Sequence, residues 1–557
     1  MIVGLDMGGT HIDAVVIENG KILNIVKRST DQKDQFNAIW ETLQKLLIGY
    51  DKSKIKRINL STTVSTNAIV EGKISAVGMI IQSGPGLPND HLACGDENVF
   101  IDGYIDHRGK VVKDLDRQEI EQAISSFERR GIKNLAIITK FSTRNPNHEI
   151  AIRNMAKSHF SHITMGHTIS GKLNFPRRVF TSYFNAAVYS TFKQFSQSIE
   201  KSLKKEGVDA PIYILKADGG TTNLDTATTK PVETILSGPA ASFMGLNAML
   251  STQEDALLLD IGGTTTDIFF LAEGVPLFEP LGIEIASYKT VVRAIYSKSI
   301  GLGGDSAINI EDGQIRIGPK RHGNPYALGG PKPTPTDAMI VLGLTNIGDK
   351  GKARDAIKKL AFKLGLSVGM AATKIIQLMG CMIREEVHNI LHYINNRPVY
   401  TIEALLHGPE IKPELIGIIG APANALKPTL EEEFGLPCHL PSNFHVANAI
   451  GAALARPTTE ITMQADTALG KLSVPEFGIY EKISKDFNLR QAKEKSLELL
   501  TKHITSTDAL DEGLEPEIIE GSSFNMVKGF FTSGQNIRVR AQIKPGLIYK
   551  LWGDSND

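Results

Sequence analysis

Two turns that combine aspartate, glycine and threonine are the strongest chemical signal in the sequence. The first spans residues 6–10 (DMGGT) and is followed by Asp13, and the second spans residues 260–264 (DIGGT) and is followed by Asp267. Paired glycines let the backbone pass close to a ligand and direct successive N–H groups at phosphate oxygens. The turns therefore predict a phosphate-binding site, with these contacts: Gly8, Gly9, Thr10, Gly262, Gly263 and Thr264.

The aspartates of the two turns indicate a cation. A bare phosphate would be repelled by a carboxylate at the end of each strand, whereas Mg²⁺ binds one or two carboxylates together with waters and phosphates. We expect Asp6 and Asp260 to bind Mg²⁺, and Asp13 and Asp267 to orient loop groups or water. These four aspartates are the predicted catalytic residues.

The elements around the two turns match each other. Apolar segments precede and follow each turn, and Asn19-Gly20 predicts a hairpin that leads into a third strand over residues 22–26. A single turn of this kind could be no more than a tight bend. Two copies in matching strand–turn–strand settings, 254 residues apart, favour the ligand-binding interpretation.

Two later turns extend the predicted site. The glycine-rich stretch over residues 300–306 can form a nest of N–H donors, with Gly303 and Gly304 as its contacts. An apolar strand over residues 414–419 runs into Gly420 and Ala421, where a base or a ribose could come close to the backbone.

Polar residues after two buried strands are candidates for binding a substrate. In α/β proteins, ligand sites lie at the carboxyl ends of strands. The candidates are Asn67, Asn145, His148 and Glu149. Two structural alternatives stay open, namely helix capping by residues 65–67 and a helix start at which residues 148–149 are solvated or act as a cap.

A third possible site combines glutamate and histidine on one predicted helix. Glu385, His388 and His392 have a spacing that places them on one helical face. The pattern fits either a partly exposed polar face or a metal site that needs further ligands.

The composition limits the classes of protein to be considered. The 557 residues include 61 lysines and arginines and 61 aspartates and glutamates, so the net charge is zero, which argues against nucleic acid as a partner. No apolar run is long enough for a membrane span, and no signal peptide is visible. The three cysteines have no metal or disulfide spacing, which indicates a reducing, cytoplasmic setting.

The ordered motifs resemble the actin-like ATPase superfamily and, within it, the hydantoinase/oxoprolinase family, in particular its N-methylhydantoinase A-like large subunits. The resemblance extends from residue 1 to about residue 455. Besides the two turns, it rests on residues 62–68, Asn145-Pro146 with His148-Glu149, Arg178 with Thr181 and Asn185-Ala186, residues 237–241 and residues 334–338. The sequence departs from the family pattern at His11-Ile12 and at Asp305.

The resemblance implies an activity. It implies ATP and Mg²⁺ as cofactors, and a hydrolase that opens a cyclic amide or imide of the hydantoin or 5-oxoproline type by phosphorylating the carbonyl oxygen. It also implies a second hydantoinase-type subunit as a partner, with a homo-oligomer as a further expectation. The alternatives are a small-molecule kinase of the same superfamily and a nucleotide switch that reactivates a partner enzyme.

The resemblance also implies a fold. We expect a two-lobed α/β structure of the actin-like ATPase type, with duplicated ribonuclease-H-like domains and a small α+β appendage at the C-terminus. The predicted boundaries are residues 1–210 for the first lobe, residues 211–456 for the second lobe with an insertion at about 281–400, and residues 457–557 for the appendage.

Overall fold

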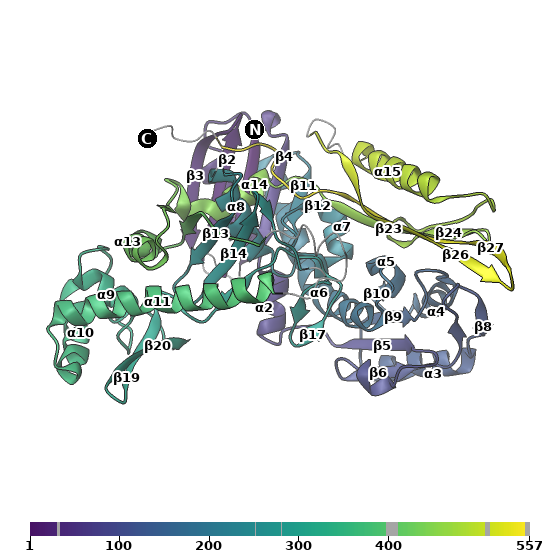
Figure 1. The fold of residues 1–557 in the computed structure, drawn as a ribbon, viewed down its shortest axis with the longest axis horizontal. Coiled ribbons are helices and arrows are strands. Elements are labelled where there is room, and N and C mark those ends of the chain that lie inside the picture. The colour runs from purple at the N-terminus through teal and green to yellow at the C-terminus, as the bar shows by residue number, and fades with distance from the viewer. Residues whose placement is uncertain are drawn as a thin grey trace. The chain divides into compact units, whose positions relative to one another are not determined.

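The computed structural model describes residues 1–9, 11–29, 34–250, 252–279, 281–396, 410–506 and 513–551 (Figure 1). The chain forms two compact units, and each is discontinuous in sequence. Unit 1 comprises Met1–Ala240, Glu279–Ala294 and Ala452–Ile548, and unit 2 comprises Ala241–Phe278, Ile295–Gly451 and the residues from Tyr549 on. The domain boundaries expected at residues 210 and 456 stay a prediction.

The first sheet of unit 1 has six strands in the order β12-β11-β4-β1-β2-β3. The predicted three-stranded meander is confirmed, since β1, β2 and β3 are antiparallel neighbours and both Asn19 and Gly20 have positive φ. The strands are β1 (Ile2–Met7), β2 (His11–Glu18), β3 (Lys21–Ser29), β4 (Arg57–Thr62), β11 (Ile212–Leu215) and β12 (Thr221–Asn223).

Helices α1 (Gln35–Leu46) and α6 (Phe175–Glu206) share a hydrophobic core with this first sheet. Leu43 and Phe192 are completely buried in that core, together with Val3 of β1. Burial of apolar side chains on this scale is the main force that holds a helix against a sheet. The helix α2 (Val64–Val70) follows β4 directly. It begins before Ser65, so the expectation that residues 65–67 cap its start is wrong.

A second, parallel sheet in unit 1 has the order β10-β9-β5-β6. Its strands are β5 (Val77–Gln82), β6 (Glu97–Phe100), β9 (Asn134–Thr139) and β10 (His162–Met165). The accompanying helices are α3 (Arg117–Arg129), α4 (Asn147–Ala156) and α5 (Gly166–Ile169), whereas α7 (Leu224–Thr229) packs against β11 and β12 of the first sheet. Two short hairpins pair β7 (Tyr104–Ile105) with β8 (Val111–Lys113) and β16 (Glu284–Ile285) with β17 (Tyr288–Lys289).

The C-terminal part of unit 1 is a five-stranded antiparallel sheet with one helix, which confirms the predicted α+β appendage (Figure 1). Helix α15 (Leu489–Ser506) covers one face of the sheet and contributes Leu500 to a shared core. The strands are β23 (Thr459–Asp466), β24 (Lys471–Val474), β25 (Ile479–Lys482), β26 (Pro516–Lys528) and β27 (Phe531–Ile543).

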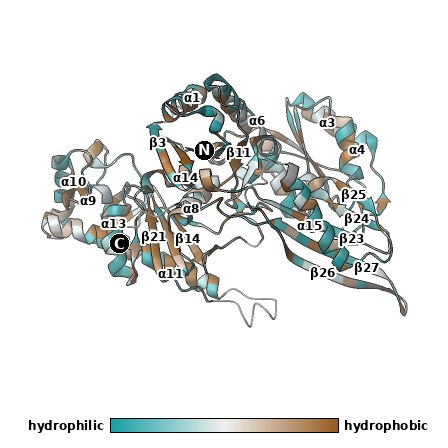
Figure 2. Cartoon of the chain, turned by 90° about the horizontal axis from the view of Figure 1, so that it is seen from above, coloured by the Kyte–Doolittle hydropathy of each residue, from teal (hydrophilic) through white to brown (hydrophobic). Residues whose placement is uncertain are grey.

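The main sheet of unit 2 has the path β15-β14-β13-β21-β22, and β18 pairs with β14. Its central strands are buried and mostly hydrophobic, as the colouring of β14 and β21 shows (Figure 2). The strands are β13 (Ala256–Ile261), β14 (Thr266–Ala272), β15 (Val275–Pro276), β18 (Lys298–Ile300), β21 (Leu415–Ile419) and β22 (Cys438–His439). A separate hairpin pairs β19 (Ser306–Glu311) with β20 (Gln314–Arg321).

Helices pack against the core of unit 2. They include α9 (Pro335–Val341), α10 (Lys350–Leu364), α11 (Val368–Asn395) and α13 (Ala423–Phe434). Helices α8 (Ser237–Met249) and α14 (Ala447–Leu454) each contain residues of both units. Among the described helices none is by itself long and apolar enough to cross a membrane, and the pair α10 and α11 reaches that length only with a 90° bend.

The predicted α/β class with duplicated halves is confirmed. In each unit a strand, a glycine turn and a second strand form a hairpin, and the first strand of that hairpin also pairs with a parallel strand. The parallel partner is β4 in unit 1 and β21 in unit 2. All three cysteines, Cys94, Cys381 and Cys438, are free thiols.

Candidate functional site

The four predicted catalytic aspartates occupy equivalent positions in the two hairpins. Asp6 of β1 lies directly opposite Asp13 of β2, and Asp260 of β13 lies directly opposite Asp267 of β14. Side chains of directly opposite residues point to the same face of a sheet. The repeat in the sequence is therefore also a repeat in strand register, and it places two carboxylates beside each turn.

The two turns are closed by equivalent hydrogen bonds. The N–H of Gly8 donates to the carbonyl of His11 at 3.0 Å, and the N–H of Gly262 donates to the carbonyl of Thr265 at 2.9 Å. These two N–H groups are therefore used inside the turns. Thr10, the predicted hydroxyl donor of the first turn, lies outside the described residues.

The second turn is hydrogen-bonded to the backbone that follows Gly303. The N–H groups of Gly304 and Asp305 donate to the carbonyls of Gly262 and Gly263, at 3.0 and 2.7 Å. A Cβ on Gly303 would lie 2.6 Å from the carbonyl carbon and oxygen of Gly263, so only glycine fits there. Gly303 and Gly304 thus support the turn, and their contact with a nucleotide stays a prediction.

Arg321 is a residue of this region that the sequence analysis missed. It lies at the end of β20, and its guanidinium donates to the Thr264 hydroxyl at 3.3 Å and pairs with the Asp305 carboxylate at 2.9 Å. Burial raises the pKa of Asp305, and the charge of Arg321 opposes that shift. Arg321 therefore brings a positive charge to the exposed side of the second turn.

The pKa values of both aspartates of the second hairpin are raised, and burial is the main cause. Burial raises the pKa of Asp260, although Asp260 Oδ2 lies 2.6 Å from the Ser242 hydroxyl, which lowers it. Burial also raises the pKa of Asp267 to about 6, against a hydrogen bond from Ser299 and with a contribution from the charge of Asp260. A cation between these two carboxylates would relieve both effects.

The first hairpin differs in that it already contains a countercharge. Lys27 of β3 pairs with Asp13 Oδ2 at 2.9 Å, while Asp13 Oδ1 is buried without a hydrogen bond. Asp6 is 7% exposed. Among the described residues no group of three or more histidine, cysteine, aspartate or glutamate side chains could hold a metal, so the set Glu385, His388 and His392 on α11 is not such a group.

The predicted adenosine turn joins β21 to α13. Gly420 has φ of +101°, which side chains rarely tolerate, and a Cβ there would lie 2.1 Å from the carbonyl oxygen of Ile261. Ala421 is exposed next to it. The end of β13 and this turn thus lie very close together, and they can do so because Gly420 has no side chain. Nucleotide contact by Gly420 and Ala421 stays a prediction.

The four substrate-side candidates separate into two places. Asn67 on α2 lies near the first turn, since a Cβ on Gly9 would be 3.8 Å from its amide nitrogen, and this amide donates to the Thr63 hydroxyl at 3.1 Å. Asn145 and His148 lie beside the second sheet of unit 1. The Asn145 amide donates to the carbonyl of Gly109 at 2.9 Å, and His148 Nδ1 lies 2.9 Å from Gln82 Oε1.

Glu149 is completely buried and binds backbone groups. Its carboxylate accepts the N–H of Thr139 at 2.7 Å and both the N–H and Nδ1 of His167, at 2.9 and 2.6 Å. Arg178, also completely buried, donates to the Ser142 hydroxyl at 2.9 Å and to the carbonyl of Lys140 at 2.6 Å. These contacts hold the loop after β9, and the substrate role of Asn67, Asn145, His148 and Glu149 stays a prediction.

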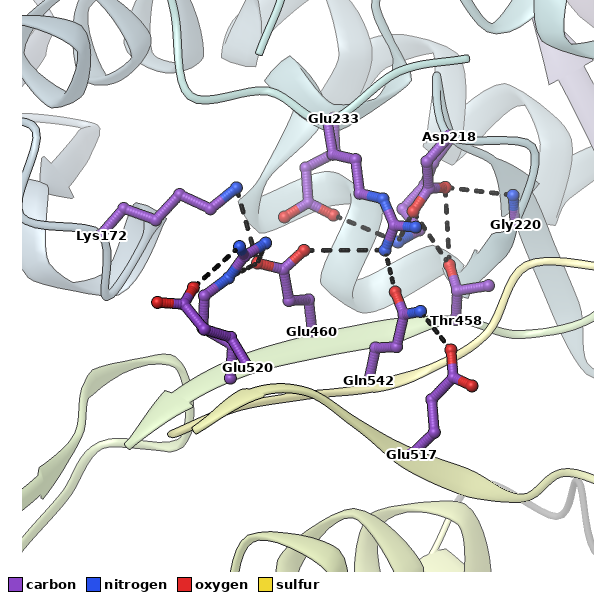
Figure 3. A network of polar contacts seen from close by, with 12 residues as sticks. Lys172, Asp218, Gly220, Glu233, Thr458, Glu460, Glu517, Glu520 and Gln542 are labelled. Carbon is purple, nitrogen blue, oxygen red and sulfur yellow. Dashed lines mark hydrogen bonds and ion pairs between the residues drawn. The ribbon is translucent and has the colours of Figure 1, made fainter. Parts of the chain in front are cut away.

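A cluster of charges lies where β23 meets the rest of unit 1 (Figure 3). The Glu460 carboxylate is faced by three cations, namely Arg540 at 2.9 Å, Lys172 at 3.5 Å and Arg293 at 3.6 Å. Burial of Glu460 opposes its ionisation, yet the three cations together lower its pKa to about 2. The ionised form of Glu460 therefore stabilises the folded state.

Replacing Glu460 with glutamine should destabilise the protein in a pH-dependent way. Since the pKa of Glu460 falls on folding, its stabilisation is complete above about pH 4.5 and is lost as the pH falls towards 2. We expect Glu460→Gln to lower the free energy of unfolding by about 2 kcal/mol at pH 7 and by much less at pH 3. Urea unfolding at both pH values measures this. Glu520→Gln, at the more exposed partner of Arg540, is the control and should change little.

Two protein-family models match most of the chain. Residues 178–461 match the model described as hydantoinase/oxoprolinase, and residues 2–160 match the hydantoinase/oxoprolinase N-terminal region.

Several characterised proteins are similar in sequence. The caprolactamase subunit alpha of Pseudomonas jessenii is 26% identical over 68% of this chain and 60% of that protein, and the acetophenone carboxylase gamma subunit of Aromatoleum aromaticum is 24% identical over 69% and 61%. The 5-oxoprolinase of Saccharomyces cerevisiae is 25% identical over 61% of this chain and 31% of that protein. The chain thus spans about three fifths, or less, of the length of these relatives.

Two solved structures share the fold over nearly the whole chain. Nucleotide-free acetone carboxylase has a TM-score of 0.71 at 17% identity, and the ATP-dependent caprolactamase from Pseudomonas jessenii has a TM-score of 0.70 at 20% identity. Each alignment covers 97% of this chain and 87% of the other. Because the two family models together match well over half of its residues, the chain belongs to the hydantoinase/oxoprolinase family.

Proposed function

We propose that this protein is an ATP-dependent hydrolase that opens a cyclic amide or imide. The observation that carries the proposal is the pair of aspartate–glycine turns in identical strand register, found in a chain of the hydantoinase/oxoprolinase family. Relatives include an ATP-dependent caprolactamase and a 5-oxoprolinase. Caprolactam and 5-oxoproline are both cyclic amides, and ATP is the second substrate that the paired turns would hold.

The chemistry explains why ATP is required. An amide carbonyl is a poor electrophile, and transfer of the terminal phosphoryl group of ATP to its oxygen makes the ring carbon open to attack by water, after which phosphate leaves. Catalysis of phosphoryl transfer is mostly positioning and stabilisation of charge. Within the described part of the chain the N–H of Gly263 makes no hydrogen bond, so it can donate to a phosphate oxygen, and the Thr264 hydroxyl and Arg321 lie beside it.

The residues of the two hairpins fit Mg²⁺. Their donors are carboxylates and hydroxyls, which are the hard oxygen ligands that Mg²⁺ prefers, and Mg²⁺ needs only one or two protein carboxylates. Asp6 and Asp260 would hold the ion, which would neutralise charge on the phosphates. Asp13 and Asp267 would orient the turns and water, and Ser242 fixes the Asp260 carboxylate through its hydroxyl.

We also propose that the active enzyme contains a second subunit. Two of the similar proteins are named as subunits, caprolactamase subunit alpha and acetophenone carboxylase gamma subunit. The subunit would be of the hydantoinase type and would supply groups for the hydrolytic step.

Analysis of the reaction products tests the proposed activity. With ATP, Mg²⁺ and a panel of cyclic amides that includes caprolactam, 5-oxoproline and hydantoin, we expect free phosphate and a ring-opened acid in equal amounts. Phosphate release is measured by a coupled assay, and the acid by mass spectrometry. The assay is run with and without the protein encoded next to this chain, if that neighbour is a hydantoinase-type subunit.

Other products would contradict the proposal. A stable phosphorylated product would indicate a kinase. ATP turnover that no cyclic amide stimulates, but that a partner enzyme does, would indicate a nucleotide switch.

A further inference from the structure

Helix α10 lies at the edge of unit 2, away from the main sheet of that unit (Figure 1). One side of the helix is apolar and packs into the core of the unit. The other side is exposed and carries six cations and one carboxylate, which we call the basic face: Lys350, Lys352, Arg354, Lys358, Lys359, Lys363 and Asp355. Unit 2 therefore presents a net positive charge along one helix.

The cations of the basic face are not neutralised within the part of the chain that the structure describes. None of them makes an ion pair there, and Lys359 has neutral partners, namely the hydroxyl of Tyr326 at 3.3 Å and the ring of the same residue. The exposed lysines of α15 in unit 1 differ, since Lys495 and Lys502 each pair with a glutamate. The basic face thus has charge available for an external anion.

The elements packed against α10 do not supply the missing negative charge. They are mainly α9, α11 and the short helix η4 (Tyr326–Leu328). The charged residue of α9, Asp337, is completely buried and accepts backbone N–H groups. Asp349 caps the start of α10, and the first three turns of α11 add the cation Lys374 and no carboxylate. Residues 342–374 therefore contain seven cations and two carboxylates, in a chain with a net charge of zero.

Phe362 lies in the middle of the basic face. Its side chain is 88% exposed, whereas Leu360 and Ala361 beside it are buried. Lys358 and Lys359 precede it by four and three positions, so their side chains are its neighbours on the helix surface. With 3.6 residues per turn, five of the six cations lie within about 100° of Phe362 around the helix axis. A partner that buries Phe362 must therefore also contact the lysines.

The composition of the basic face favours a lipid membrane over other polyanions. Interfaces between proteins are depleted in lysine, and arginine is the usual residue for contacts with nucleic acid. Five of the six cations on α10 are lysines. Four to eight basic residues on one helix are typical of surfaces that bind anionic lipid headgroups, and an aromatic side chain among them can enter the headgroup region.

We propose that the basic face of α10 is a docking surface for a membrane that contains anionic lipids. The cations would contact headgroup phosphates, and Phe362 would enter the boundary between headgroups and acyl chains. Because the apolar side of α10 is used in the core of unit 2, the helix would lie on the membrane surface without crossing it. The inference concerns where the protein is located, so it does not depend on the proposed hydrolase activity.

Sedimentation of the full chain with lipid vesicles tests this surface. We expect binding to vesicles of phosphatidylcholine mixed with phosphatidylglycerol, no binding to vesicles of phosphatidylcholine alone, and a fall in affinity as the ionic strength rises. Lys358→Gln combined with Lys359→Gln should weaken binding about tenfold or more, since both lysines lie near the lipid surface. Phe362→Ser should weaken binding severalfold without lowering the midpoint of thermal unfolding, because the ring is exposed.

A matched variant removes two exposed lysines from a helix of unit 1. Lys201→Gln combined with Lys204→Gln, on α6, changes the net charge by the same amount and should leave binding unchanged. A third variant, Phe362→Trp, reports on the position of the ring. Its tryptophan emission should move to shorter wavelength when anionic vesicles bind, and bound protein without this shift would refute the entry of residue 362 into lipid.

Several results would overturn the proposal. They are a failure to bind anionic vesicles, an equal loss of binding in the α6 and α10 lysine variants, and tighter binding to polyuridylate or polyglutamate than to the vesicles at the same ionic strength. The last result would assign the basic face to a nucleic acid or to an acidic protein. The unfolding midpoint shows whether each variant has folded, and Lys352→Gln combined with Lys363→Gln replaces the α10 lysine variant if it has not.

Discussion

Asp260→Asn should lower the rate of ATP hydrolysis by about a hundredfold or more without unfolding the protein. The substitution keeps the shape of the side chain and an oxygen that the Ser242 hydroxyl can reach, but removes the charge that would bind Mg²⁺. Loss of one preorganised electrostatic contact typically costs a factor of 100 to 1,000 in turnover. Because burial raises the pKa of Asp260, the neutral amide should leave stability unchanged or improve it.

A control next to the same strand tests whether the loss of activity is specific to Asp260. Asp255 immediately precedes β13, at the end away from the turn, and its carboxylate accepts the N–H groups of Glu273 and Lys412. Asp255→Asn should keep turnover within about twofold, since the residue is outside the predicted site. Steady-state phosphate release and the unfolding midpoint are measured for both variants. Near-normal turnover in Asp260→Asn would refute the metal-binding role of this residue.

Gly420→Ala should cause a large loss of both stability and ATP hydrolysis. A Cβ at this position would lie 2.1 Å from the carbonyl oxygen of Ile261, so the backbone of β13 or of the turn has to move. The positive φ of +101° adds strain of its own. We expect a cost of about 3 kcal/mol, which corresponds to a fall of roughly 6–12 °C in the unfolding midpoint of a unit of this size.

Gly435→Ala separates strain from steric overlap. Gly435 ends α13 with a positive φ of +65°, but no atom lies within 4 Å of the Cβ that alanine would add. Its cost should be about 1 kcal/mol, from the left-handed backbone alone, with turnover unchanged. Calorimetry and the phosphate assay compare the two variants. If both variants lost the same stability and turnover, the close approach of Gly420 to Ile261 would not be the reason why position 420 requires glycine.

Local patterns account for what the sequence predicted well. The two hairpins are built from apolar strands and glycine turns that are contiguous in sequence, so both the elements and their equivalence could be recognised. The meander whose second turn is Asn19-Gly20 is of the same kind. The structure adds a further case in the helix that begins at Pro335, where Thr334 and Asp337 form a capping box. In each of them, residues only a few positions apart determine the conformation.

Long-range contacts account for what the sequence did not reveal. Arg321 reaches Thr264 across 57 positions, and only because the β19–β20 hairpin brings it there. From the sequence, Glu149 is either a substrate contact or a solvated or capping residue at a helix start, yet its carboxylate is buried against His167, 18 positions later. Glu460 pairs with Lys172, which precedes it by almost 300 positions. No local pattern encodes such neighbours.

The discontinuity of unit 1 has a consequence for synthesis on the ribosome. The buried amide of Asn59, in β4, donates to the carbonyls of Ala452, Ala453 and Ala455. Those acceptors are translated almost 400 residues later, on the order of half a minute at roughly 5–20 residues per second. During that interval the Asn59 amide lacks these acceptors, and the part of unit 1 that buries it has not been made. Unit 1 can therefore complete its folding only after its C-terminal segment has been made.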